Sequence, residues 1–271
     1  MPARLMKDSA DIIAGPLTKI LNMSLSVGQF PSEWKSARIV PLLKSGKPKI
    51  MDNYHPISIL PIASKILERA VHTQLYSFLS SNNLLSPYQF GFRKQHSTET
   101  ASICLTDTIR LNMDHGRLTG AVFVDFSKAF DTIDHRKLLS KLEALGINGA
   151  ELNWFTNYLS DRQQSVHYQN ASCDSSVITS GVPQGSILGP LLFVIFVNET
   201  PSTVSRCSVM MYADDTVLFF ASQNVEEMEA VLNQELDTLY FWLTENSLFL
   251  NKKKTEFIIF GKNCQSEQQS L

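Results

Sequence analysis

An acidic pair interrupts the apolar segment Val209-Met-Met-Tyr-Ala-Asp-Asp-Thr-Val-Leu-Phe-Phe220. Apolar residues flank the central Ala213-Asp214-Asp215 on both sides, a pattern that predicts a β-hairpin with acidic residues at its turn. A second apolar run, Ala121-Val-Phe-Val124, predicts a buried strand that ends at Asp125. Carboxylates at the ends of such apolar strands require a reason, and binding a metal ion is one.

Helices and strands are interspersed along the rest of the chain. Apolar spacing predicts helices at about 12–21, 64–79, 98–114, 135–145 after an N-cap at Asp134, 151–159, from Ile187 onward, and 225–243. Further strands are expected at 37–43, 164–179 and 257–260. Since an antiparallel hairpin lies among these helices, we expect an α+β fold with helices packed on one face of an antiparallel sheet.

Composition indicates an ordinary globular protein. The 271 residues are 44% hydrophobic and 18% charged, which fits one large domain or two small ones and excludes disordered and collagen-like classes. The net charge of −2 means that any nucleic-acid-binding surface must be local. The four scattered cysteines favour neither a zinc site nor a disulfide framework. The apolar run Leu191 to Val197 is too short to span a bilayer, so we expect a soluble intracellular protein of the nucleus or cytoplasm, without membrane contact.

Magnesium binding is one chemistry that suits the acidic sites. Mg²⁺ prefers hard oxygen ligands and is usually held by one or two carboxylates, with waters and substrate phosphates completing its shell. Two such ions can catalyse phosphoryl transfer, and Asp125, Asp214 and Asp215 suit that task if folding brings the two strands together. Taken alone, an Asp-Asp pair is more simply explained as turn residues, and Asp125 as a helix cap.

Other motifs give the acidic sites a context. The segments Phe123–Asp131, Gly181–Phe193 and Tyr212–Thr216 resemble, in order, polymerase motifs A, B and C of the reverse transcriptases of non-LTR retrotransposons, closest to the jockey-like branch. Upstream, similarity to the fingers motifs of that family covers Trp34–Pro41, Asp52–Ser58, Ser64–Glu68 and Gln89–Lys94. Downstream, Leu250–Glu256 resembles motif D.

The resemblance implies a right-hand polymerase with fingers and palm. Fingers with an N-terminal extension are expected over about 1–115, mainly palm over about 116–262, and a polar tail over 263–271. The palm sheet would be antiparallel with helices packed on it. The thumb is expected to be missing, because the sequence stops shortly after motif D.

The resemblance also assigns catalytic roles. Asp125 and Asp214 would bind two Mg²⁺ ions, with Mn²⁺ as an alternative, and the main-chain carbonyl of Phe126 would be a further ligand. Asp215 would serve as a ligand or as electrostatic support. Lys254 matches the lysine that protonates or neutralises departing pyrophosphate, although one of three consecutive lysines is equally explained as a solvated surface residue.

Further residues would contact the nucleotide and the template. Phe130 lies where the family places the aromatic gate against a 2′-OH, but it is equally explained as a core residue. Gln184 and Gly185 would line the nucleotide and template pocket, and Pro183 would contact template or primer, although a plain Pro-Gly turn is the alternative.

Three basic or titratable residues complete the nucleotide and template predictions. Lys44 and Arg93 are candidates for triphosphate or template contact, against the usual place of such residues on a surface. His55 stands where the family usually has an arginine, so nucleotide affinity is expected to fall with the loss of a fixed charge.

Three functions are compatible with these patterns. The first is an RNA-directed DNA polymerase that uses an RNA template, a DNA primer and deoxynucleoside triphosphates. The second is a truncated, catalytically weak or silent remnant that acts at most as a nucleic-acid-binding or interaction module. The third is an RNA-dependent RNA polymerase, against which Phe130 at the gate position counts.

Overall fold

A computed structural model describes residues 3–169 and 171–261. The chain forms two compact units, and each is built from two separate stretches. The first unit comprises Met1–Leu84 with Ile133–Leu192, and the second comprises Leu85–Thr132 with Phe193–Leu271. Because the units interleave along the sequence, neither corresponds to a single span before or after residue 115, and the fingers and palm boundaries stay predictions. The expected tail over 263–271 lies outside the described residues.

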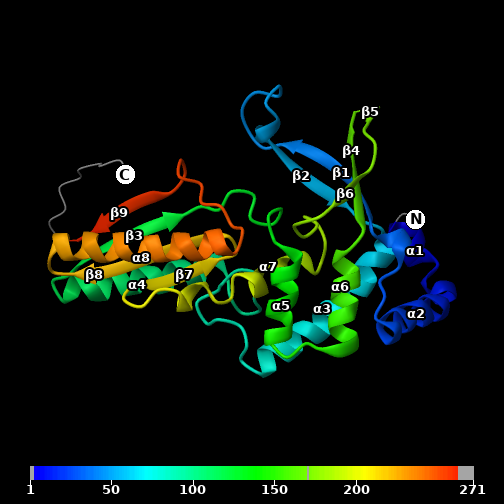
Figure 1. Ribbon diagram of the computed structural model, residues 1–271, viewed down its shortest axis with the longest axis horizontal. Helices are drawn as coiled ribbons and strands as arrows, with labels where there is room; N and C mark the ends of the chain where they lie inside the picture. The colour runs from blue at the N-terminus through cyan, green and yellow to red at the C-terminus, as the bar shows by residue number, and fades with distance from the viewer. Residues whose placement is uncertain (1–2, 170, 262–271) are drawn as a thin grey trace. The chain divides into compact units, whose positions relative to one another are not determined.

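The second unit contains an antiparallel sheet with the strand order β7-β8-β3-β9 (Figure 1). Its strands are β3 Leu118–Val124, β7 Ser208–Tyr212, β8 Asp215–Ser222 and β9 Glu256–Phe260. All three pairings between neighbours are antiparallel, which confirms the expected sheet and its hairpin. The central strands are the most apolar ones, because they are covered on both faces.

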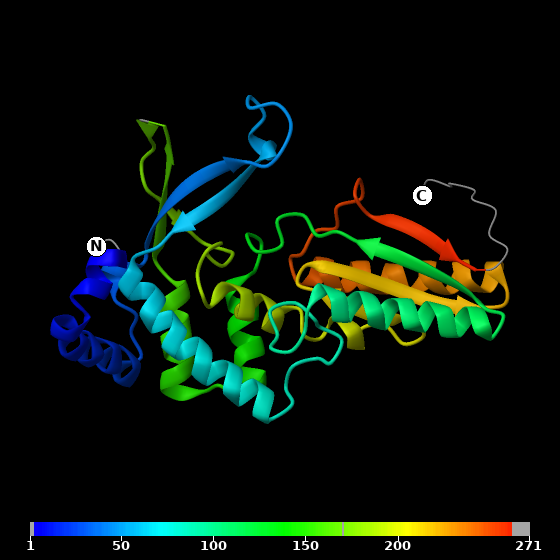
Figure 2. The same cartoon turned by 180° about the vertical axis from the view of Figure 1, so that it is seen from behind.

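Helices cover both faces of this sheet, so the expectation that helices pack on one face is wrong. On one face Ala121 packs in a core cluster with Ala101 of α4 (Thr98–Asp114). On the other, an added Cβ at the adjacent Gly120 would meet Leu232 of α8 (Val225–Glu245) at 2.6 Å. Neighbouring strand residues point to opposite faces, which places the two helices on opposite sides. Figures 1 and 2 show α8 and α4 on either side of the strands.

The first unit is mostly helical. Its helices are α1 Ala3–Asp8, α2 Ala10–Val27, α3 Ile62–Ser81, α5 His135–Ala144 and α6 Gly149–Leu159. An eight-residue helix, α7 Gly189–Phe196, spans the point where the chain passes from the first unit to the second. As expected, Asp134 caps α5, because its side chain accepts hydrogen bonds from the main-chain amides of Arg136 and Lys137.

A mixed sheet completes the first unit. Its strands are β1 Ser36–Leu43, β2 Tyr54–Ile59, β4 Arg162–Tyr168, β5 Ala171–Ser172 and β6 Ser176–Ile178. β1 pairs antiparallel with β2 and parallel with β4, and β4 pairs antiparallel with β5 and β6. The expected polar strand region at 164–179 thus consists of three short strands.

Two local expectations fail. β2 was not expected, because Pro56 and the polar residues around it weaken the strand pattern, yet its pairing with β1 is regular. The helix expected from Ile187 begins two residues later, at Gly189, because Ile187 and Leu188 donate their main-chain amides to a carboxylate instead.

Of the cysteines, Cys104, Cys173 and Cys207 are free thiols, and Cys264 lies outside the described residues. None of the helices in the described part of the chain is long and apolar enough to cross a membrane.

Candidate active site

The two acidic sequence motifs meet at one edge of the β7-β8-β3-β9 sheet. Val124, the last residue of β3, pairs with Thr216, which directly follows Asp215 in β8. Asp125 therefore follows β3 at the same edge where the β7-β8 turn carries Asp214 and Asp215. This convergence at one edge of the sheet is as expected.

Asp125 is held by the segment that precedes β9. The side-chain Nδ2 of Asn251 donates to Asp125 Oδ2 at 2.8 Å, and the main-chain amide of Asn251 donates to the Asp125 carbonyl at 2.8 Å. The Nζ of Lys254 lies 4.0 Å from the same Oδ2. The Asp125 side chain keeps 31% of its surface exposed and that of Lys254 keeps 62%, so this ion pair is wet and weak. Lys254, which was predicted to act at the site, and Asn251, for which no role was predicted, therefore both lie beside the Asp125 carboxylate.

Asp214 lies in a two-residue turn of unusual backbone geometry. The pairing of Tyr212 with Asp215 leaves Ala213 and Asp214 as the turn. Ala213 adopts a φ of +57°, in the left-handed region that residues with a Cβ seldom enter. Positive φ at the first turn residue is typical of tight hairpins, because it matches the twist of the strands.

A buried glutamine contacts this turn. Gln89 is fully buried, its Oε1 accepts from the main-chain amide of Ala213 at 2.9 Å, and its Nε2 donates to the Ala213 carbonyl at 3.3 Å. Next to it, a Cβ added to Gly91 would lie 2.1 Å from the nitrogen of Ala213. This segment was predicted to belong to the fingers. Its hydrogen bonds to the hairpin turn were not predicted, because no sequence periodicity indicates them.

The oxygen donors at this edge fit a magnesium ion. The pairing of Phe126 with Leu250 uses the Asp125 carbonyl and the Ser127 amide, so the Phe126 carbonyl points to the opposite side, where β8 lies. Within residues 3–169 and 171–261, no three His, Cys, Asp or Glu side chains are grouped closely enough to hold a metal. Magnesium is usually held by only one or two carboxylates, because it takes its other ligands from water and phosphates.

Phe130 is partly exposed and rests on other aromatic rings. Its ring stacks on Phe193 at a centroid distance of 4.6 Å and meets Phe92 edge-on at 6.2 Å. Two aromatic rings thus pack against the Phe130 side chain, and its role as a gate stays a prediction.

Arg93 turns back onto its own loop. Its Nη1 donates to the carbonyl of Ser86 and, at 3.4 Å, to that of Gln89. The Arg93 side chain is half-buried, and its hydrogen bonds close the loop. Contact with the template stays a prediction.

In the first unit, the motif B loop lies against the end of β2. The carbonyl of Gln184 accepts from the main-chain amide of Ser58 at 2.8 Å. A Cβ on Gly185 would lie 2.7 Å from the Ser58 carbonyl, and this glycine has a φ of +109°, so only glycine fits. The carbonyl of the buried Pro183 accepts from both the amide and the hydroxyl of Ser186. The loop is therefore an ordered structure that differs from a simple Pro-Gly turn.

A buried carboxylate fixes the same loop. Glu68 of α3 is fully buried, and its Oε2 accepts from the amides of Ile187 at 2.7 Å and Leu188 at 3.3 Å. Its Oε1 accepts from the hydroxyl of Ser64 at 2.8 Å. Burial, assisted by the negative charge of Glu68, raises the pKa of Tyr158 beside it. Glu68 belongs to the segment Ser64–Glu68, for which no catalytic role is predicted, and its carboxylate anchors the loop.

Lys44 and His55 lie in the β1-β2 hairpin of the first unit. Lys44 follows β1 and is exposed, while its main-chain amide donates to the carbonyl of Asn53 at 2.8 Å. His55 is exposed on β2, opposite Leu42. Both side chains are accessible to a ligand, and their contacts with a triphosphate stay predictions.

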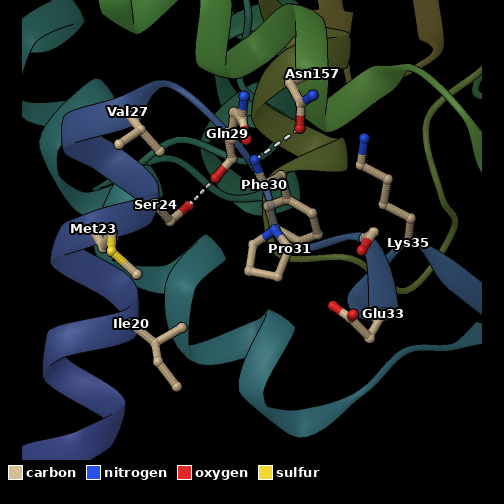
Figure 3. Close-up of a pocket in the computed structure, with 11 residues that line it drawn as sticks. Ile20, Met23, Ser24, Val27, Gln29, Phe30, Pro31, Glu33, Lys35 and Asn157 are labelled. Atoms are coloured by element: carbon tan, nitrogen blue, oxygen red, sulfur yellow. Dashed lines mark hydrogen bonds between the residues drawn. The ribbon is translucent and has the colours of Figure 1, made fainter.

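A separate hollow in the first unit contains none of these residues. It has a volume of about 340 Å³ and lies between α2, the loop 29–35 and Asn157 of α6 (Figure 3). Its walls are held by hydrogen bonds from Ser24 to the Gln29 carbonyl and from the Phe30 amide to Asn157. Burial lowers the pKa of Lys35 on its rim. Apolar and charged side chains both line the hollow.

Comparison with solved structures defines the class of fold. Apo telomerase from Candida tropicalis, truncated from its C-terminal domain, superposes with a TM-score of 0.60 at 14% identity, covering 86% of this chain and 52% of that one. Telomerase from Candida albicans, solved with a fragment of telomeric RNA, gives a TM-score of 0.61 at 14% identity, covering 85% and 44%. The fold is therefore that of a right-hand polymerase.

Sequence comparison gives the family. The family model described as reverse transcriptase (RNA-dependent DNA polymerase) matches residues 43–270, and this chain belongs to that family. It is 35% identical over 247 residues to a probable RNA-directed DNA polymerase from transposon BS of Drosophila melanogaster, covering 88% of this chain and 27% of that protein. The polymerase of the mobile element jockey of the same fly is 31% identical over 258 residues, covering 92% and 28%. The chain thus spans about a quarter of these relatives, which are non-LTR retrotransposon proteins, and members of its family use divalent metal ions.

Proposed function

We propose that this chain is the catalytic part of an RNA-directed DNA polymerase that joins deoxynucleoside triphosphates to the 3′-hydroxyl of a DNA primer on an RNA template. The observation that carries the proposal is the convergence of Asp125 with Asp214 and Asp215 at one edge of an apolar antiparallel sheet. The three carboxylates, each exposed at least in part, together with the Phe126 carbonyl would supply the oxygen donors that two Mg²⁺ ions, or Mn²⁺, require.

Asp125, Asp214 and the Phe126 carbonyl would hold the ions, with Asp215 as a ligand or electrostatic support. When bound, the ions supply activation of the attacking 3′-oxygen and stabilisation of the leaving oxygen. Lys254, whose Nζ lies 4.0 Å from Asp125, would give a proton to pyrophosphate or neutralise its charge.

Other residues would select and orient the nucleotide and template. Phe130, supported by Phe193, would clash with a 2′-OH and so favour deoxynucleotides. Gln184 and Gly185 would line the nucleotide pocket, from a loop whose backbone is fixed against the Ser58 main chain.

The remaining assignments concern the triphosphate and the nucleic-acid backbone. Exposed Lys44 and His55 would face the triphosphate, and Arg93 and Pro183 would contact template or primer. His55 provides a weaker hold than an arginine would, because a neutral imidazole lacks both the fixed charge and the planar fork of donors.

The proposal is tested by primer extension with the purified chain on RNA and on DNA templates. Asp214→Asn should reduce extension below detection and leave the circular dichroism spectrum unchanged, because the carboxylate serves the metal and not the core. Asp237→Asn, on the exposed face of α8, is the matched control and should extend primers at the wild-type rate. Wild-type extension by Asp214→Asn would refute the assignment.

A second candidate is a nucleic-acid-binding module without catalysis, which the exposed His55 in place of an arginine favours. In that case the wild-type chain would bind a primer-template duplex and leave the primer unextended at every Mg²⁺ and Mn²⁺ concentration. Extension that depends on Asp214 would exclude this candidate.

A further inference from the structure

We propose that Gln89 is a positioning residue of the active site, whose buried amide holds the Ala213-Asp214 turn in the conformation that presents the Asp214 carboxylate. The inference rests on the proposed metal-binding role of Asp214. Gln89 itself would touch neither metal nor substrate, and it would act through the backbone of Ala213.

The contacts of Gln89 match the donors and acceptors of the turn. Its Oε1 accepts from the amide of Ala213 at 2.9 Å and from the amide of Gly91 at 2.7 Å. Its Nε2 donates to the Ala213 carbonyl at 3.3 Å. The side-chain amide therefore pairs with both backbone groups of one residue, as a neighbouring strand would, and every one of these contacts is buried.

The turn needs such a restraint. Ala213 has a φ of +57°, which is unfavourable for a residue with a Cβ and persists only where the surroundings enforce it. The residue after it is Asp214, so a change of backbone conformation at Ala213 would redirect the carboxylate. A metal ligand has to be held to within a fraction of an ångström, and the amide of Gln89 supplies that restraint.

The backbone around Gln89 brings its side chain to the turn. The amide of Phe90 donates to the carbonyl of Met211 at 2.7 Å, and the amide of Met211 donates to the carbonyl of Tyr88 at 2.8 Å. This short parallel bridge sets residues 88–90 beside β7, directly before the turn. A substitution of the Gln89 side chain would leave this main-chain bridge in place. The effect of the side chain on the turn can therefore be measured separately from that of the bridge.

The test compares Mn²⁺ binding, followed by electron paramagnetic resonance on the full chain without nucleic acid, with thermal stability. Gln89→Met keeps the length of the side chain and removes its polar atoms. We expect the dissociation constant for Mn²⁺ to rise about tenfold, the lower end of the effect of residues that orient metal ligands. The Mg²⁺ concentration for half-maximal primer extension should rise by a similar factor.

Thr119→Val is the matched control. Thr119 is also fully buried and hydrogen-bonded, through its hydroxyl to Asn112 at 3.1 Å, but it lies near the start of β3, away from Asp125. This variant should lose stability and keep its affinity for Mn²⁺. If Gln89→Met does not fold, Gln89→Asn replaces it, since that change keeps an amide in the core and withdraws it by one methylene; a several-fold loss of Mn²⁺ affinity is then expected.

The outcomes separate this inference from the proposed function. If the wild-type chain binds Mn²⁺ and the Gln89 variant binds it equally well, the positioning role is overturned and the metal site stands. Equal loss of Mn²⁺ affinity in the Thr119 control would also overturn the role, because it would show a general effect of stability. If the wild-type chain binds no Mn²⁺, the metal site itself fails, and this inference fails with it.

Discussion

The two sides of the candidate metal site are held by different physical means. Asp125 is fixed by a half-buried amide, that of Asn251, and by an ion pair with the exposed Lys254, so water can replace both contacts. The turn that carries Asp214 is fixed by the fully buried Gln89 and by a glycine with no spare room. Losing a buried partner leaves unsatisfied groups, which costs more than losing a wet one. One side of the site is therefore rigid, and the other can adjust.

Gly91→Ala should give the largest effect, because it breaks the rigid side. The added methyl would lie 2.1 Å from the nitrogen of Ala213, and backbone must move to admit it. Overpacking of this kind typically costs about 1–3 kcal/mol of stability, and here the displaced atoms are those of the turn. Thermal unfolding and Mn²⁺ binding should both show a loss, and a variant with wild-type values for both would show that the turn tolerates displacement.

Asn251→Ala should have a smaller effect on the adjustable side. The backbone pairing around Phe126 remains, while the Asp125 carboxylate loses its donor, so we expect Mn²⁺ affinity to fall up to about tenfold with little change in unfolding temperature. Thr255→Val is the control, because it removes a 3.0 Å bond to the Asn251 carbonyl and leaves Asp125 untouched. If Asn251→Ala lost more Mn²⁺ affinity than Gln89→Met, the Asp125 side of the site would be the more rigid of the two.

Phe130→Ala should leave metal binding unchanged and alter the choice of sugar. The ring is partly exposed and stacks on Phe193, so its removal opens space without touching a carboxylate. Ribonucleotides should be incorporated more readily in primer extension, with an unchanged Mg²⁺ requirement. Continued exclusion of ribonucleotides would assign Phe130 to the core.

Local signals predicted much of the fold. The helix expected at 98–114 has the bounds Thr98–Asp114, because Ser97 forms a capping box at its start and Gly116 follows its end with a φ of +68°. The hairpin at Asp214 was predicted by the apolar runs on either side of a polar turn. In each case the decisive interactions join residues close together in the sequence.

The residues that hold the site could not be predicted in this way. Gln89 and Ala213 are 124 positions apart, and Glu68 and Ile187 are 119 apart. A single buried polar side chain has no periodicity, and its partner is a main-chain group that every residue possesses. Motif resemblance supplied Asp125 and Asp214, while their supports became visible only through the tertiary contacts.

Because the two units interleave along the sequence, the two stretches of each unit are synthesised at different times. Residues 1–84 are synthesised before Ile133–Leu192, which complete the same unit. At about 5–20 residues per second, the 108 residues from 85 to 192 take roughly 5–20 seconds to synthesise. During that interval Glu68 of α3 lacks the main-chain amides of Ile187 and Leu188 to which it is hydrogen-bonded in the finished protein. The carboxylate that anchors the motif B loop therefore gains its loop partners only after residue 188 has been synthesised.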